Sequence, residues 1–454
     1  MSFRPNFAWG VATASYQIEG AYNEDGKGKS IWDTYCDQEG RIYSNQSGKV
    51  ACDHYHRYKE DIAVMKEIGV KAYRFSIAWT RILPHGTGEI NEAGIKFYSD
   101  LIDELLKNGI EPYITLYHWD LPVELHYKGG WLNREIVDWF AEYAGIIAKN
   151  YSNRVKKFIT INEPQCIIGS GYGTGINAPG LKLSTEEMII ASHNLMLAHG
   201  AAVKAMRKYG AEDIQIGYAP TGSGAYPHTE TQKDIAAARE KLFEVDADCW
   251  DWSISWYTDP IFLGKYPEDG LRFLGKYLPE KWESDMDDIC QPLDFLCINL
   301  YNGKEYQKTD KGIELVERYA GFPRTAMDWP ITPEAIGWTL RFLYERYNLP
   351  LYVSENGISC SDIVSLDGKV HDSNRIDFVT RYLLEVEKAI NSGADVRGYF
   401  HWSFMDNFEW GHGYKERFGL VFVDYRTQER IIKDSGYWYK TIIESNGEKL
   451  KQEI

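Results

Sequence analysis

The chain has 454 residues, a net charge of −16 and a pI near 5.2. This acidic balance argues against nucleic acid and anionic membranes as partners, because both bind basic surfaces. The seven cysteines are irregularly spaced and form no C-x-x-C pair, so neither a disulfide framework nor a zinc site is indicated. Without a signal-peptide pattern or a membrane-length apolar run, a cytoplasmic protein is expected.

Eight short segments rich in apolar and β-branched residues alternate with helical patterns along the chain. Such segments are typical of strands that are buried on both faces of a sheet. The expected strands are Phe7–Ala14, Ala72–Ala78, Tyr113–Tyr117, Lys157–Asn162, Ile214–Ala219, Phe295–Leu300, Leu351–Ser354 and Gly398–Trp402. Apolar residues spaced by three and four predict helices over 55–68 and 95–105, and Gly109 marks the end of the second.

This alternation predicts one (β/α)₈ TIM barrel over residues 1–454, with its active site at the carboxyl ends of the strands. A doubly wound open sheet is the competing architecture. No glycine-rich phosphate loop follows the first strand, which weighs against a nucleotide-binding version of that alternative.

Polar and aromatic residues follow most of the expected strands, where a barrel would gather them around one pocket. They are Gln17, Arg74, His118, Trp119, Asn162, Glu163, Asn299, Tyr301, Glu355 and Trp402.

Two glutamates are the most informative members of this set. Glu163 lies in T-I-N-E-P (160–164) and Glu355 in S-E-N-G (354–357), each directly after an expected strand. Strands four and seven would place them facing each other across the rim. Paired carboxyls suit cleavage between sugars, where one donates a proton and the other attacks the anomeric carbon. A single Glu in a loop is usually a surface residue, but two in such contexts favour catalysis.

The neighbouring residues fit this chemistry. Asn162 is placed to bond a sugar 2-hydroxyl, a contact that strengthens in the transition state. Arg74 would keep a carboxylate ionised, and Tyr301 would donate to the same carboxylate. His118 has no partner histidine at metal-ligand spacing, so it is expected to bond a hydroxyl and not a metal.

These motifs resemble glycoside hydrolase family 1, the β-glucosidase family, over nearly the whole chain. The resemblance rests on A-S-Y-Q-I-E-G (14–20), T-I-N-E-P, S-E-N-G and the N-F-E-W run (407–410). It implies a (β/α)₈ barrel, retention of configuration, a part in cellulose breakdown, and neither cofactor nor metal. The implied substrate is a small β-glycoside or oligosaccharide, and the oligomeric state stays open.

The resemblance also implies roles for individual residues. Glu163 would be the general acid/base and Glu355 the nucleophile, supported by Arg74 and Tyr301. The substrate-binding residues would be Gln17, His118, Trp119, Asn162, Tyr301, Trp329, Trp402, Glu409, Trp410 and Phe418. Ser354, Leu300 and Gln165 depart from the family pattern. Gln165 stands where relatives often have Trp, which suggests a more polar leaving-group site.

Glu409 narrows the range of sugars that the chain is expected to act on. A carboxylate at this position would repel a sugar phosphate, so a free 6-hydroxyl is predicted. The sequence leaves glucose, galactose and fucose undecided. Transfer of the sugar to an alcohol acceptor and sugar binding without catalysis are the alternative functions.

Overall fold

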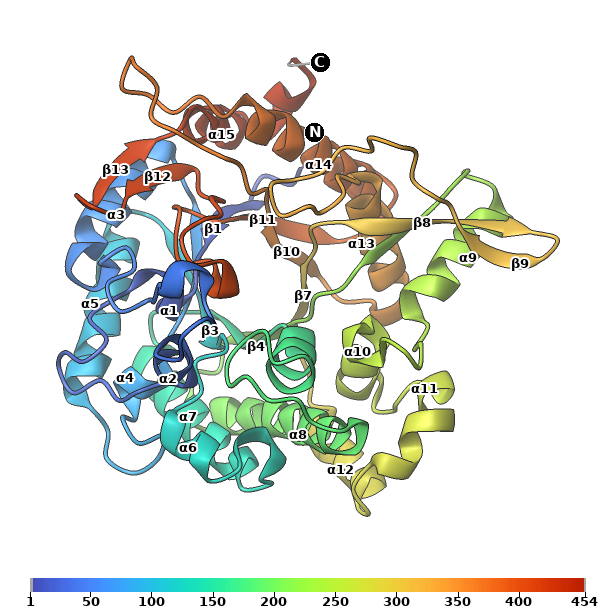
Figure 1. Ribbon diagram of the computed structural model, residues 1–454, viewed down its shortest axis with the longest axis horizontal. Coiled ribbons are helices and arrows are strands. Elements are labelled where there is room, and N and C mark those ends of the chain that lie inside the picture. The colour runs from blue at the N-terminus through green and yellow to red at the C-terminus, as the bar shows by residue number, and fades with distance from the viewer. Residues whose placement is uncertain (1–2, 453–454) are drawn as a thin grey trace.

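The computed structural model describes residues 3–452 and contains a closed barrel of eight parallel strands (Figure 1). Around the ring the order is β1-β11-β10-β7-β5-β4-β3-β2. Their bounds are β1 Ala8–Ala12, β2 Ala72–Ser76, β3 Glu111–Tyr117, β4 Lys157–Asn162, β5 Gln215–Ala219, β7 Phe295–Asn299, β10 Leu351–Asn356 and β11 Val396–Trp402. All eight expected strands are therefore present, and closure of the ring excludes the open sheet.

Helices surround the barrel because each βα unit must return the chain to the start of the next parallel strand. The longer ones are α3 His54–Ile68, α5 Glu92–Lys107, α7 Ile136–Tyr151, α8 Thr185–Tyr209, α9 Gln232–Phe243, α10 Ile254–Leu263, α12 Trp282–Ile289, α13 Glu334–Tyr347, α14 Ser373–Asn391 and α15 Asp434–Glu444. Among the described helices, none has both the length and the apolar composition that crossing a bilayer requires.

Local signals explain where individual helices begin and end. Ser184 and Glu187 form a capping box at the start of α8, which satisfies backbone donors that the first turn leaves free. After α3, Gly69 adopts a positive φ of 81° and closes the helix. The helices predicted over 55–68 and 95–105 correspond to α3 and α5.

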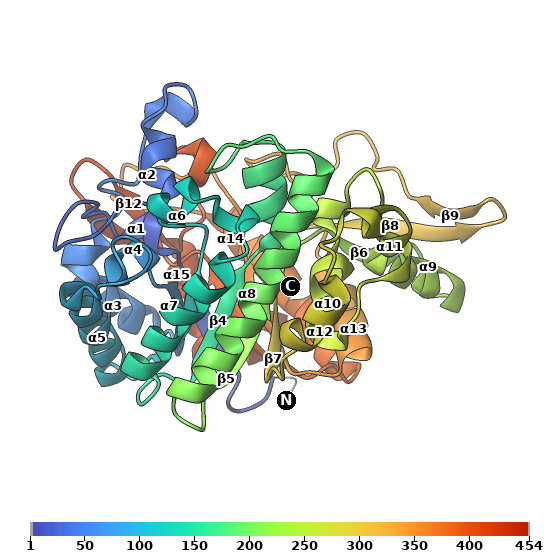
Figure 2. The same cartoon turned by 90° about the horizontal axis from the view of Figure 1, so that it is seen from below.

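Shorter elements lie in the loops and in the outer layer. They are the helices α1 Ser15–Ile18, α2 Ile31–Cys36, α4 Trp79–Ile82, α6 Val123–Tyr127 and α11 Glu268–Leu274, the three-stranded sheet β6 Gly224–Pro227, β8 Gly303–Thr309 and β9 Gly312–Leu315, and the hairpin β12 Val421–Asp424 and β13 Glu429–Ile432. Figure 2 shows the β8–β9 hairpin projecting beyond the barrel beside α9.

Aromatic rings fill the barrel interior below the carboxyl ends of the strands. Tyr113 packs edge-on against Phe400 at 4.8 Å between ring centroids, and Phe295 packs against Tyr352 at 5.1 Å. These rings close the barrel from below. Arg74 on the neighbouring strand β2 pairs in register with Tyr113 on β3.

Candidate active site

Both glutamates lie where the strand pairing is irregular. The β4–β5 register shifts between Ile159 and Asn162, and Glu163 follows with a positive φ of 47°. The prediction that Glu355 follows its strand was wrong, because β10 continues to Asn356 through a shift after Val353. Such bulges re-aim side chains at barrel rims. The two carboxyls are buried, at 6% and 3% exposure.

Glu355 is held by a cation and a phenol. Arg74 Nη1 donates to Glu355 Oε1 at 2.6 Å, and Tyr301 Oη donates to Oε2 at 2.8 Å. Arg74 lies on β2 and is 1% exposed. Water therefore screens its charge little, and its attraction to the neighbouring carboxylate is strong. The structure therefore places both predicted supporting residues on Glu355.

Glu163 has neutral partners within the described chain. Asn299 Nδ2 donates to Oε1 at 2.7 Å, and Cys166 Sγ donates to Oε2 at 3.0 Å. Asn299 ends β7, and β7 and β5 lie between β4 and β10 in the ring. Ser354 Oγ donates to Asn299 Oδ1 at 2.6 Å, so one amide links the Glu163 side of the pocket to the Glu355 strand.

The charge environment differs between the two acids. Burial raises the pKa of both carboxyls above the usual range. For Glu355, the Arg74 cation and the Tyr301 hydroxyl oppose this rise by stabilising the anion. Glu355 contacts a guanidinium at 2.6 Å, whereas the direct partners of Glu163 are neutral, so the contacts favour Glu355 as the site of the negative charge.

A second amide organises the centre of the pocket. Asn162 Oδ1 accepts from Arg74 Nη2 at 2.5 Å and from Asn299 Nδ2 at 2.9 Å. Its Nδ2 therefore donates to His118 Nε2, 3.1 Å away. The imidazole proton is then on Nδ1. Burial lowers the pKa of His118 well below its usual value, and Arg74 lowers it further, so the ring is neutral.

One wall of the pocket is aromatic and carries two unsatisfied polar groups. Trp119 lies 4.6 Å from Trp410 between ring centroids, and its indole N–H is bonded to the Asn162 carbonyl at 3.0 Å. Gln17 Nε2 donates to the Phe408 carbonyl at 2.8 Å, while Gln17 Oε1 is buried with no partner in the described chain.

Glu409 is the second polar group on this wall, and it is partly exposed. No side chain of the described residues bonds its carboxyl. Burial, followed by the nearby Glu355 charge, raises the pKa of Glu409 to about 8. Unused hydrogen-bonding capacity in a buried pocket is what a polar ligand would complete.

The remaining predicted residues border the same pocket. Trp402 lies beside His118, with ring centroids 5.8 Å apart. Tyr301 contacts Trp329 at 5.2 Å, and Phe418 lies 6.3 Å from Tyr301.

Gln165 does not face the pocket as the sequence suggested. It is fully buried, its Nε2 donates to the Ser253 carbonyl at 3.3 Å, and its Oε1 accepts from Thr221 N at 3.2 Å. Its amide ties the loop after β4 to two neighbouring loops. The prediction of a more polar leaving-group site was therefore wrong.

Two contacts of Glu163 were not predicted from the sequence. Asn299 was marked only as a residue at a strand end, and Cys166 only as one of seven cysteines. Asn299 had a usable signal, because it ends a buried strand beside Tyr301. The thiol contact had none, because it depends on the turn that follows Glu163.

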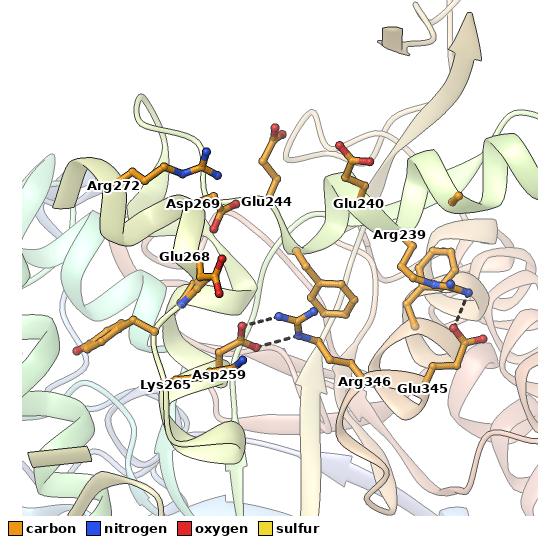
Figure 3. Close-up of a pocket in the computed structure, with 15 residues that line it drawn as sticks. Arg239, Glu240, Glu244, Asp259, Lys265, Glu268, Asp269, Arg272, Glu345 and Arg346 are labelled. Carbon is orange, nitrogen blue, oxygen red and sulfur yellow. Dashed lines mark hydrogen bonds and ion pairs between the residues drawn. The ribbon is translucent and has the colours of Figure 1, made fainter. Parts of the chain in front are cut away.

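A large hollow on the outer layer of helices is unrelated to this pocket (Figure 3). It lies between α9, α10, α11 and α13, and no predicted site residue lines it. Arg346 pairs with Asp259 through contacts of 2.9 and 2.5 Å, and Arg239 pairs with Glu345 at 2.6 Å. These charges stabilise the contact between helices.

The barrel and its buried pair of carboxyls define a class, the (β/α)₈-barrel glycosidases. The family model for glycosyl hydrolase family 1 matches residues 1–448. Beta-glucosidase A of Thermotoga maritima is 46% identical over 449 residues, covering 98% of each chain. The 1,4-beta-D-glucan glucohydrolase of Thermotoga neapolitana is 46% identical over 452 residues, covering 98% of this chain and 99% of that protein.

The solved structures agree. Beta-glucosidase from Thermotoga maritima in complex with glucoimidazole has a TM-score of 0.90 at 46% identity, and the match covers 98% of this chain and 99% of that one. The chain therefore belongs to glycosyl hydrolase family 1 and is a retaining glycosyl hydrolase. The alternative of a sugar-binding protein without catalysis is set aside.

Proposed function

We propose that this enzyme is a β-glucosidase that releases terminal β-D-glucosyl residues by double displacement, with Glu355 as nucleophile and Glu163 as general acid/base. The observation that carries the assignment is the asymmetry of the two carboxyls. Glu355 is bonded to a guanidinium and a phenol, whereas Glu163 has only an amide and a thiol. The first environment suits an anion and the second suits a proton donor.

In the first step, Glu355 attacks the anomeric carbon and the bond to the leaving oxygen breaks. Glu163 transfers its proton to that oxygen as the bond breaks. The product is a glucosyl ester of Glu355 and a Glu163 carboxylate. Esterification removes the Glu355 charge, which lowers the pKa of Glu163 and prepares it to act as a base.

In the second step, the Glu163 carboxylate takes a proton from water as the water attacks the anomeric carbon. The ester bond breaks and Glu355 leaves as a carboxylate, so the sugar keeps its β configuration. Asn162 Nδ2 has a second hydrogen that the His118 contact leaves unused. This hydrogen is available for the sugar 2-hydroxyl, a contact that strengthens as charge develops at the anomeric centre.

The first sugar subsite is assigned to the residues that border the pocket. Glu409 and Gln17 Oε1 would accept hydrogen bonds from sugar hydroxyls, and Trp402 and Trp410 would contact the ring. A free 6-hydroxyl follows from the same arrangement, because Glu409 would repel a phosphate. This predicts turnover of an aryl β-D-glucoside and none of its 6-phosphate; preferential turnover of the phosphate would overturn the assignment of Glu409.

Azide rescue tests the two catalytic roles separately. In Glu355→Gly, azide should restore activity on an activated aryl β-glucoside and give the α-glucosyl azide, because it replaces the missing nucleophile. In Glu163→Ala, azide should give the β-glucosyl azide, because it attacks the ester without needing a base. The same anomer from both variants, or near wild-type activity of either without azide, would refute the roles.

Three further assignments belong to the proposal. We infer that cellobiose and short cello-oligosaccharides, the products of cellulose breakdown, are substrates. This draws on relatives named beta-glucosidase and 1,4-beta-D-glucan glucohydrolase. We also infer a reducing cytoplasm, which agrees with free thiols at all seven cysteines. The whole chain is assigned to one catalytic domain.

A further inference from the structure

The thiol of Cys166 is fixed next to the carboxyl of Glu163 by a tight turn. The backbone N–H of Cys166 donates to the Glu163 carbonyl at 3.1 Å, and that of Ile167 donates to the same oxygen at 3.2 Å. A π-helical segment, Cys166–Gly173, then begins. The turn holds Sγ 3.0 Å from Glu163 Oε2, while Asn299 bonds Oε1 at 2.7 Å. The carboxyl is therefore held from both of its oxygens.

The thiol stays protonated in this position. Burial raises the pKa of Cys166 well above its usual value, and the Glu163 and Glu355 charges raise it further. The S–H group is therefore available to donate to Oε2 when Glu163 is a carboxylate. When Glu163 is protonated, sulfur is only a weak acceptor, so it competes little for the proton that must reach the leaving group.

Resting on the proposed function, we propose that Cys166 is a positioning residue. Its thiol supports the Glu163 carboxylate through the Sγ–Oε2 hydrogen bond and leaves the acid proton free for the leaving group. A hydroxyl in its place would donate more strongly and over-stabilise the carboxylate, whereas a methyl group would leave Oε2 without a donor. The thiol is intermediate between these extremes, which suits a group that must act first as an acid and then as a base.

Other groups also influence Glu163, and they stay constant in the test. The titratable and charged side chains facing the Glu163–Cys166 pair are Glu355 on β10, Arg74 on β2, Tyr301 after β7, Glu409 in the loop after β11, and Tyr257 on α10 with Asp251 before it. These groups are the same in both variants. They therefore cannot cause shifts of opposite sign in the pKa of Glu163 when Cys166 is replaced by two different residues.

The test compares Cys166→Ser and Cys166→Ala by the pH dependence of kcat/KM on an aryl β-D-glucoside with a poor leaving group. The alkaline limb of this profile reports the proton on Glu163 in the free enzyme. We expect the limb to move to lower pH in the serine variant and to higher pH in the alanine variant, each by roughly half a unit. Cys290→Ser and Cys290→Ala, in the outer layer after α12, should leave the limb in place.

A purely structural role would reduce activity without moving the limb in opposite directions. Limbs that coincide with wild type, or that shift the same way in both variants, would overturn the proposal. Glu163→Gln, measured on a substrate with a good leaving group, separates this failure from a failure of the proposed function. If Glu163 is the acid, its alkaline limb disappears in that variant; if the limb survives, the catalytic assignment itself is wrong.

Discussion

Two groups of buried charges in this molecule are composed in opposite ways. The catalytic pocket contains three carboxyls, Glu163, Glu355 and Glu409, around the single guanidinium of Arg74. The second group, the buried ion-pair network, balances three carboxylates with three cations. Its members are Asp362, Asp372, Asp406, Arg375, Arg417 and Lys433.

The difference is visible in how each acid responds to burial. Burial would raise the pKa of Asp362, but Lys433 at 2.5 Å and Arg375 at 2.8 Å bring it below the usual value. In the pocket, no cation in the described part of the chain offsets the effect of burial on Glu409, and its pKa rises to about 8. The network is arranged for a charged resting state, whereas the pocket sets three carboxyls against one guanidinium, and no side chain of the described residues bonds the carboxyl of Glu409. Acids with perturbed pKa values that are gathered in this way are typical of functional sites.

The largest expected effect comes from removing the nucleophile. Glu355→Ala should lower kcat on an aryl β-D-glucoside by about 10⁵-fold, since no other group can form the ester. Because it also leaves the buried Arg74 guanidinium without its carboxylate partner, the variant should unfold somewhat more easily than wild type. Steady-state kinetics and thermal unfolding measure the two results; a retained kcat would contradict the comparison.

Substitutions in the buried ion-pair network should reduce stability more than they reduce activity. Arg375→Met leaves Asp362 and Asp372 without a guanidinium and should reduce the free energy of unfolding by about 3–5 kcal/mol. Denaturant unfolding measures this loss. Arg426→Met is the matched control, because Arg426 pairs with Asp424 while 88% exposed, and it should change stability by less than about 1 kcal/mol. Equal effects of both substitutions would contradict the account.

Glu409 should matter for activity and not for stability. Glu409→Gln removes the carboxyl acceptor for sugar hydroxyls and should lower kcat/KM for β-glucosides by about 100-fold, because the hydrogen bonds that a carboxylate accepts from bound sugar contribute about 1.5–3 kcal/mol each. Its melting temperature should be at least that of wild type. A lower melting temperature with unchanged kcat/KM would show that Glu409 stabilises the fold and does not bind the substrate.

The last expected effect is a slope in stability against pH. Glu409 has a folded-state pKa of about 8, above its unfolded value, so between the two values the native state binds more protons than the unfolded chain. Its contribution to stability therefore falls as pH rises from about 5 to about 8. The melting temperature of wild type minus that of Glu409→Gln should decline over this pH range. A difference that rises with pH would contradict the prediction.

The fold and most of the site could be predicted from the sequence. Segments dense in apolar and β-branched residues located all eight barrel strands, and the rule that chemistry lies at strand ends singled out Arg74 and Tyr301, which lie beside Glu355. Contacts made by a local turn could not be predicted. The bulge that extends β10 past Glu355, the thiol of Cys166 against Glu163, and the burial of Gln165 all depend on backbone geometry that residue types alone do not specify.

The proposed mechanism requires that the ionised carboxyl beside Arg74 becomes covalently attached to the sugar. A 2-deoxy-2-fluoro-β-D-glucoside with a good leaving group tests it directly, because fluorine slows both steps while the leaving group lets the first proceed. Peptide mass spectrometry of the inactivated enzyme should find the fluorosugar on Glu355. Its attachment to Glu163 or Glu409, or inactivation without a covalent adduct, would contradict the account.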